Sequence, residues 1–303
     1  MRQRRPDRER LRNLWPMGKP KTPGYGISTG FYLTVLSTKA TLPTLVEVIE
    51  PGGTNGAVPG FGVPLAANST KEDLNRPLAR GAYALADLER KTVLKLFVLS
   101  KEEAFFDPDP ILSAPLAADL APEVVERLRA TWTLLQLTFQ AHDPMVASSL
   151  EFLLNIAGRL SERCDGLVAD PICRRYLLPH QLRHRDPPGP IDARNFVSTD
   201  QRPARPVAVF TRGMVKFGLP EFELVDVPLD WVERAQVFLV GAAQAVFNHG
   251  PVAAGGLLGS RKAPFEVREG GLDPLYWEGI PCFELHPTQG VARGLDAWWD
   301  ENR

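Results

Sequence analysis

The stretch from Met145 to Pro179, MVASSLEFLLNIAGRLSERCDGLVADPICRRYLLP, decides the fold class. In its first half, apolar residues recur at helical spacing with polar residues between them; they are Val146, Leu150, Leu153, Leu154, Ala157 and Leu160. Such a stripe predicts an amphipathic helix that buries one face. We expect Asp143 to cap this helix, Pro144 to be its first residue, and Gly166 to follow its last turn.

Two short strands are predicted directly after this helix, at 167–169 and 176–178, with an Asp-Pro turn between them. Apolar runs or alternating patterns predict more strands at 31–36, 93–99, 135–140, 207–210, 222–225, 265–268 and 280–285. Further helices are expected at 75–90, 122–130, 229–248 and 291–299, and a Gly- and Pro-rich loop at 51–64. The order of elements indicates an α+β fold with mixed or mostly antiparallel sheets and helices packed on one face.

Composition limits the class of protein. The chain has 303 residues, 44% of them hydrophobic and 23% charged, which is ordinary for a globular protein. Its net charge of -1 argues against a general nucleic-acid binder. We expect a basic mobile tail at 1–24, the one segment suited to nucleic acid, and an α+β domain at 25–303. A division into two lobes, 25–115 and 116–303, is the alternative, and a basic Pro-rich loop at 181–205 is the best candidate for disorder.

The cysteine content and hydropathy indicate a location. Cys164, Cys173 and Cys282 are too few, and odd in number, for a disulfide framework, so they fit a reducing compartment. The sequence has no run of 18 apolar residues that would span a membrane, and its Arg-rich start lacks the apolar core of a signal peptide. We therefore expect a cytoplasmic protein without a membrane partner.

Two features would suit a hydrolase. Gly26 to Gly30 reads GISTG, which matches the G-x-S-x-G pattern around a nucleophilic serine, here Ser28. In that pattern a strand precedes the serine, whereas here a loop precedes it and a strand follows, so a structural loop is the preferred interpretation. His142 and Asp143 lie together at a predicted strand end, but Asp143 is already expected as a helix cap.

A small zinc module is the second alternative. Cys164, Cys173, His180 and His184 have suitable ligand atoms, and the two histidines have finger-like spacing. The two cysteines are eight residues apart in sequence, which is too far for a zinc knuckle. We therefore expect no metal and no cofactor.

The segment from Thr211 to Glu221, TRGMVKFGLPE, is the predicted binding surface. Its glycines permit tight turns, and Arg212, Lys216 and Glu221, with Glu223 beyond, are expected to form an exposed polar cluster. The alternative is that the glycines only make turns while Phe217 packs in the core. A rigid strand on either side would hold such a surface in place.

The same residues carry a resemblance to a known family. A helix followed by GLVADP (Gly166 to Pro171), then TRG (Thr211 to Gly213), Phe217-Gly218 and Pro220-Glu221, resembles a bacterial family of unknown function. The resemblance spans roughly 93–285 and implies an α+β fold of bacterial type, with no catalytic residue to carry over. The function expected is a non-catalytic interaction or accessory protein, of which an immunity-type protein is one form, with another protein as its partner.

Overall fold

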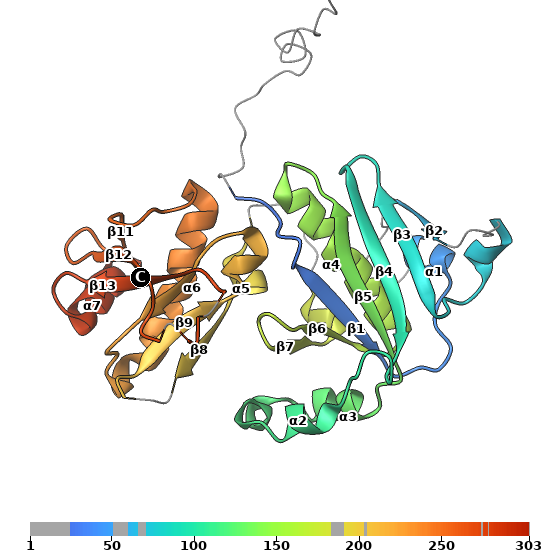
Figure 1. Cartoon of the computed structure of the whole chain (residues 1–303), viewed down its shortest axis with the longest axis horizontal. Coiled ribbons are helices and arrows are strands. Elements are labelled where there is room, and N and C mark those ends of the chain that lie inside the picture. The colour runs from blue at the N-terminus through green and yellow to red at the C-terminus, as the bar shows by residue number, and fades with distance from the viewer. Residues whose placement is uncertain are drawn as a thin grey trace, which may run out of the picture.

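The computed structural model describes residues 25–50, 60–65, 71–182, 191–202, 205–273, 275–277 and 279–302. They form the predicted α+β fold, with two sheets that lie side by side and helices packed on them (Figure 1). The predicted tail at 1–24 lies outside the described residues. Among the helices described, none combines the length and the apolar character needed to cross a bilayer.

The first sheet is wholly antiparallel and has the strand order β2-β3-β4-β5-β1-β6-β7. Its strands are β1 Tyr32–Ser37, β2 Phe61–Pro64, β3 Gly81–Asp87, β4 Thr92–Ser100, β5 Thr133–Ala141, β6 Leu167–Asp170 and β7 Arg175–Leu177. β5, β6 and β7 thus share a sheet with β1 to β4. The division between the two sheets falls after Leu177. The alternative division into lobes at 115 stays a prediction.

The second sheet is mixed and has the order β11-β12-β13-β10-β9-β8. Its strands are β8 Ser198–Arg202, β9 Ala208–Arg212, β10 Glu221–Leu224, β11 Leu257–Leu258, β12 Phe265–Glu269 and β13 Cys282–Pro287. β10 and β13 run parallel, and the other pairs are antiparallel. β8 lies at an edge of this sheet, and β7 at an edge of the first.

The helices pack on the sheets through their apolar sides. They are α1 Leu45–Ile49, α2 Pro108–Leu112, α3 Pro122–Arg129, α4 Val146–Arg163, α5 Ala193–Phe196, α6 Val232–His249 and α7 Val291–Glu301. Shorter 3-10 turns are η1 Lys71–Asn75, η2 Pro115–Asp119, η3 Pro179–Gln181, η4 Met214–Phe217 and η5 Leu229–Trp231. α4 covers one face of the first sheet, α3 packs against the opposite face, and α6 and α7 cover one face of the second sheet.

The predicted α4 is confirmed, with a different first turn. The helix begins at Val146 because Asp143 forms a separate turn, in which its Oδ1 accepts from Met145 N–H at 2.7 Å. At the other end Asp165 has a positive φ of 49°, and Gly166 N–H donates to Ser161 O at 2.8 Å. A Cβ at Gly166 would lie 2.4 Å from the carbonyl oxygen of Leu36 in β1. Gly166 therefore lets the end of α4 approach the first sheet closely.

Two predicted elements differ in the described residues. The helix expected at 75–90 is η1 followed by β3, because pairing with β2 and β4 outweighs the helical spacing of its apolar residues, of which Leu88 is 73% exposed. Part of the loop expected at 51–64 is β2, at 61–64, while 51–59 lies outside the description. Within 181–205, the candidate for disorder or a partner-induced fold, residues 191–202 form α5 and β8.

An aromatic cluster joins the two sheets. Phe217 of η4 is buried, and its ring centroid lies 6.0 Å from Phe31, 5.8 Å from Phe196 and 4.9 Å from Phe247. Phe31 precedes β1, whereas the other rings belong to the second half of the chain. Edge-on aromatic pairs at such distances add stabilisation to the apolar area that they bury. The alternative prediction, that Phe217 packs in the core, is confirmed.

Candidate functional site

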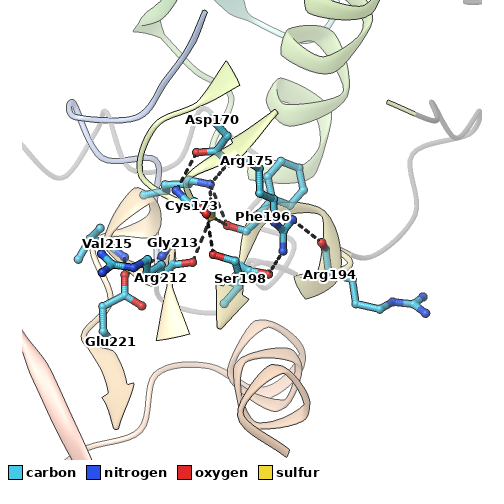
Figure 2. Close-up of polar contacts among 12 residues, drawn as sticks. Asp170, Cys173, Arg175, Arg194, Phe196, Ser198, Arg212, Gly213, Val215 and Glu221 are labelled. Carbon is cyan, nitrogen blue, oxygen red and sulfur yellow. Dashed lines mark hydrogen bonds and ion pairs between the residues drawn. The ribbon is translucent and has the colours of Figure 1, made fainter. Parts of the chain in front are cut away.

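The turn between β6 and β7 brings polar side chains onto the second sheet. Figure 2 shows Asp170, Cys173 and Arg175 from this turn converging on Phe196, Ser198 and Arg212 from the second half of the chain. Ser198 Oγ donates to Cys173 O at 3.0 Å, and Arg175 Nη1 donates to Arg194 O at 2.7 Å. The edge of the first sheet is therefore fastened to the beginning of β8.

Lys216 is the centre of this contact and is fully buried. Its ammonium group forms an ion pair with Asp170 and donates to Phe196 O at 2.8 Å and to Cys173 Sγ at 3.0 Å. An ammonium has three N–H donors, so these three acceptors use all of them. We call Asp170, Cys173 and Lys216 the inter-sheet cluster.

The thiol of Cys173 behaves as a donor within this cluster. Its Sγ lies 3.0 Å from Phe196 O and 3.1 Å from Arg212 O, both of which are acceptors. Burial raises the pKa of Cys173, with the Asp170 charge acting in the same direction, while Lys216 lowers it in part. A raised pKa keeps the thiol protonated, which is the opposite of what a nucleophilic cysteine requires. The cluster is suited to holding two sheets together and not to covalent chemistry.

The backbone around Lys216 is shaped by Gly213 and by a buried carboxylate. Gly213 has φ +121°, and a Cβ there would lie 2.2 Å from Phe196 O. Glu221 Oε1 accepts from Gly213 N–H at 2.7 Å, and its Oε2 accepts from Thr211 Oγ1 at 2.6 Å. Burial raises the pKa of Glu221, while these hydrogen bonds lower it in part. Glu221 therefore holds the conformation of the turn that places Lys216 in the inter-sheet cluster.

Glu223 occupies a second buried position, on the face of β10 away from α6. It forms an ion pair with Arg202 at 2.9 Å and accepts from Leu272 N–H at 2.7 Å. Trp277 Nε1 donates to the same carboxylate at 3.3 Å. These bonds hold Leu272 and Trp277 against the face of the second sheet away from α6, so Glu223 also has a structural role.

An open polar group lies beside these buried ones. Asp200 Oδ2 is shared by Arg212 Nε at 3.0 Å and Arg174 Nη1 at 3.6 Å, and Arg212 also contacts the hydroxyl of Tyr276. The side chain of Arg174 is 59% exposed. These residues border a hollow of about 580 Å³ whose other wall comes from Ala114 and Asp119. This hollow, which we call the arginine pocket, is accessible to a ligand.

A second hollow of about 630 Å³ lies on the α6 side of β8. Its apolar lining comes from Ile191, Val237, Val240, Gly241 and Trp298, and we call it the α6 pocket. Thr199 of β8 and Gln236 of α6 line both hollows. The two pockets therefore adjoin along β8, and we call them together the β8 groove.

The structure does not assemble the residues of the hydrolase alternative. Ser28 N–H donates to Lys216 O at 2.7 Å, and Ser28 Oγ accepts from Gly30 N–H at 3.3 Å, so the serine belongs to the loop before β1. His142 Nδ1 lies 3.2 Å from Asp143 O, and its ring packs edge-on against Phe139. No described histidine is within hydrogen-bond distance of Ser28, and the strand follows the serine as predicted.

The zinc candidates have separate surroundings. Cys164 is buried at the end of α4, Cys173 is in the inter-sheet cluster, and His180 is exposed in η3. His184 lies outside the described residues. Within the described ranges, no three His, Cys, Asp or Glu side chains gather closely enough to hold a metal ion.

The predicted exposed cluster of Arg212, Lys216, Glu221 and Glu223 is wrong for three of its four residues. Lys216, Glu221 and Glu223 are buried because each satisfies donors or acceptors in the interior, whereas Arg212 borders the arginine pocket. Whether any of them binds a partner stays a prediction. Sequence reasoning missed Asp170, Arg174 and Asp200. The one available signal was Asp170 in the Asp-Pro turn, where the Asp side chain accepts from Cys173 N–H at 3.2 Å.

Comparisons with protein-family models, characterised proteins and solved structures find no match for this chain. The resemblance to a bacterial family of unknown function therefore stays a prediction.

Proposed function

We propose that this protein is a non-catalytic accessory protein of the cytoplasm that binds an extended segment of another protein along the β8 groove. The observation that carries the proposal is the outer edge of β8, which pairs with no second strand among the described residues and lies beside two pockets. An edge strand presents unpaired backbone groups that can add a strand from another chain. An immunity-type protein, which acts by binding another protein, is one form of this proposal.

The distribution of polar groups favours binding over catalysis. Three side chains could in principle act as a nucleophile, acid or base: Lys216, Cys173 and Glu221. They are buried and bonded to one another or to the backbone. A catalytic group must touch its substrate, and these face the interior. The accessible groups, Arg174, Arg212 and Asp200, are suited to polar recognition.

The outer edge of β8 offers a partner strand the backbone groups of Thr199, whereas Gln201 N–H and Val197 O are already bonded within the chain. Gln201 N–H donates to Asp200 Oδ1 at 2.8 Å instead of to β9. In an antiparallel ladder, alternate residues point their backbone groups to opposite edges. The backbone groups of Thr199, two residues away, therefore face outward with those of Gln201. In the part of the chain that the structure describes, β8 pairs with β9 alone.

The test uses a single backbone donor. Thr199→Pro removes the outward N–H, and proline is compatible with an edge strand where that N–H does not serve the ladder. Thr199→Val is the matched control, because it changes the side chain and keeps the N–H. Peptides would be selected from a random displayed library on the wild-type protein. Binding to wild type, to Thr199→Pro and to Thr199→Val would then be compared by fluorescence anisotropy.

We expect Thr199→Val to bind the selected peptides as wild type does and Thr199→Pro to bind about tenfold or more weakly, because main-chain hydrogen bonds supply affinity in strand addition. Slower hydrogen exchange at the amides of Thr199 and Gln201 in the complex is the second expected result. Peptides that bind Thr199→Pro with undiminished affinity, or a library that yields no binder, would contradict the proposal.

A further inference from the structure

We infer that the α6 pocket takes a large apolar side chain of the bound segment, so that the segment has apolar residues at alternate positions and polar residues between them. This inference rests on the proposed strand addition at β8. The α6 pocket specifies which side chains the bound segment carries, whereas the edge of β8 alone does not.

The faces of β8 define which side chains of a partner meet which pocket. Asp200 lies opposite Phe210 in the β8–β9 register, and Phe210 packs edge-on against Trp277 on the face away from α6. Gln201 lies opposite Val209, which belongs to the core covered by α6. Since side chains alternate between the faces of a sheet, Thr199 and Gln201 are on the α6 face.

A strand added to β8 would follow the same alternation. Its residues opposite Thr199 and Gln201 would place their side chains on the α6 side, and the one opposite Thr199 would lie over the α6 pocket. Its intervening residues would lie on the face of Asp200, Arg174 and Arg212, at the arginine pocket. The α6 pocket is lined by more apolar than charged residues, whereas the lining of the arginine pocket is mainly polar and charged, so the two pockets favour different side chains.

The α6 pocket is held open by its own packing. Gly241 has no side chain, and Trp298 of α7 lies against it; a Cβ there would be 2.6 Å from Trp298 Cζ2. Gln244 accepts from Ala193 N–H at 2.8 Å and donates to Ile191 O at 2.8 Å, which keeps α5 against α6. The polar groups of Gln244 are thus occupied in holding the wall, and the rest of the lining combines the apolar residues with polar ones, among them Asp192, Arg194 and Asn248. Val237 is 43% exposed at its mouth.

An extended protein segment fits these observations better than a small apolar molecule. The pocket is not an isolated cavity, because it continues along β8 through Thr199 and Gln236 into the charged pocket. A strand is the one ligand that would use the outward backbone groups and both pockets together. Large apolar side chains buried in pockets also dominate the energetics of such interfaces.

The test is a reversal of specificity. The probes are short synthetic peptides in which Thr alternates with a variable residue that is Phe, Leu, Ala, Asp or Lys. Wild type is expected to prefer Phe or Leu over Asp and Lys by about tenfold or more, since apolar burial and charge desolvation both favour this order. Val237→Glu should lose this preference and favour Lys. Leu229→Glu, at an exposed position before α6 that lines neither pocket, should bind as wild type does.

The variants separate this inference from the proposed function. If Thr199→Pro abolishes peptide binding while Val237→Glu keeps the preference for Phe and Leu, the α6 pocket is not the selecting site and strand addition stands. If neither variant alters binding, both proposals fail.

A concentration-dependent dimer that Thr199→Pro dissociates would show that a second copy of this chain occupies β8, and not a segment of another protein. Displacement of an apolar dye without any peptide binding would overturn it as well.

Discussion

The inter-sheet cluster and the arginine pocket are neighbours built from similar charged residues, yet they differ in exposure. In the cluster, Lys216 contacts Asp170 and two further acceptors and is fully buried. In the pocket, Arg174 shares Asp200 with Arg212 and keeps most of its side chain in solvent. Charge content alone therefore does not mark a binding surface in this chain. A group available to a partner is one whose bonds within the protein leave it exposed.

The two regions also differ in what a substitution costs. Removing one member of a buried, hydrogen-bonded pair leaves its partner charged in a medium of low dielectric constant. Removing one member of an exposed pair changes stability by only about 0–1 kcal/mol. Substitutions in the buried region should therefore change stability, and substitutions in the exposed region should change binding.

The largest effect is expected for Lys216→Met. Methionine fills similar space but leaves the carboxylate of Asp170 buried without its cation, so the free energy of unfolding should fall by about 3–5 kcal/mol. Urea denaturation followed by tryptophan fluorescence measures the change. Lys262→Met is the matched control, because Lys262 is exposed, and it should change stability by less than about 0.5 kcal/mol.

A second substitution sharpens this test. Asp170→Asn removes the negative charge while keeping an acceptor for Cys173 N–H, so Lys216→Met with Asp170→Asn should be more stable than Lys216→Met alone. A double variant as unstable as the sum of the two single variants would show that the charges do not interact, because independent sites are additive.

The next largest loss of stability is expected at Gly213, which we compare with Gly218 on the other side of η4. Gly213→Ala should lower the free energy of unfolding by about 2–4 kcal/mol, because its Cβ would clash with Phe196 O at a backbone φ that alanine rarely adopts. Gly218 has φ +66° and open space around the position of a Cβ, so Gly218→Ala should cost only about 1 kcal/mol. If both variants lose the same free energy of unfolding in the same denaturation measurement, the close approach of Gly213 to α5 is not the reason that this position needs glycine.

The sequence predicts elements where local pattern and pairing agree. The stripe in 146–163 and the alternation in 135–140 both correspond to the structure, as α4 and β5. It fails at 75–90, where the spacing fits a helix but the two neighbouring strands determine the conformation. Spacing is a local property, whereas sheet membership depends on segments distant in the chain.

The candidate site was less predictable than the fold for the same reason. The sequence singles out the segment 211–221 but not its burial, because Asp170 and Cys173, which bury Lys216, lie more than forty residues earlier. The β8 groove was hidden within 181–205, whose proline and charge content suggested disorder. The sequence alone predicts neither the edge position of β8 nor the pocket beside Trp298. Each is formed by chain segments that are distant in sequence and meet only on folding.

The smallest effect concerns the pH dependence that Glu221 gives to stability. Glu221→Gln keeps the shape of the side chain but replaces one acceptor oxygen with a donor amide, which should cost about 1–2 kcal/mol near pH 7. Burial raises the pKa of Glu221 in the folded protein above its ordinary value of 4.5. A carboxyl with a raised folded pKa contributes stability that is fully present below its unfolded pKa and is lost as pH rises through the folded pKa.

Wild type should therefore gain stability relative to Glu221→Gln as pH falls from 7 toward 4.5. Urea denaturation of both proteins across this range measures the difference. A difference that stays constant, or that shrinks as pH falls, would show that the hydrogen bonds from Gly213, Val215 and Thr211 outweigh burial and that the carboxylate is the preferred form.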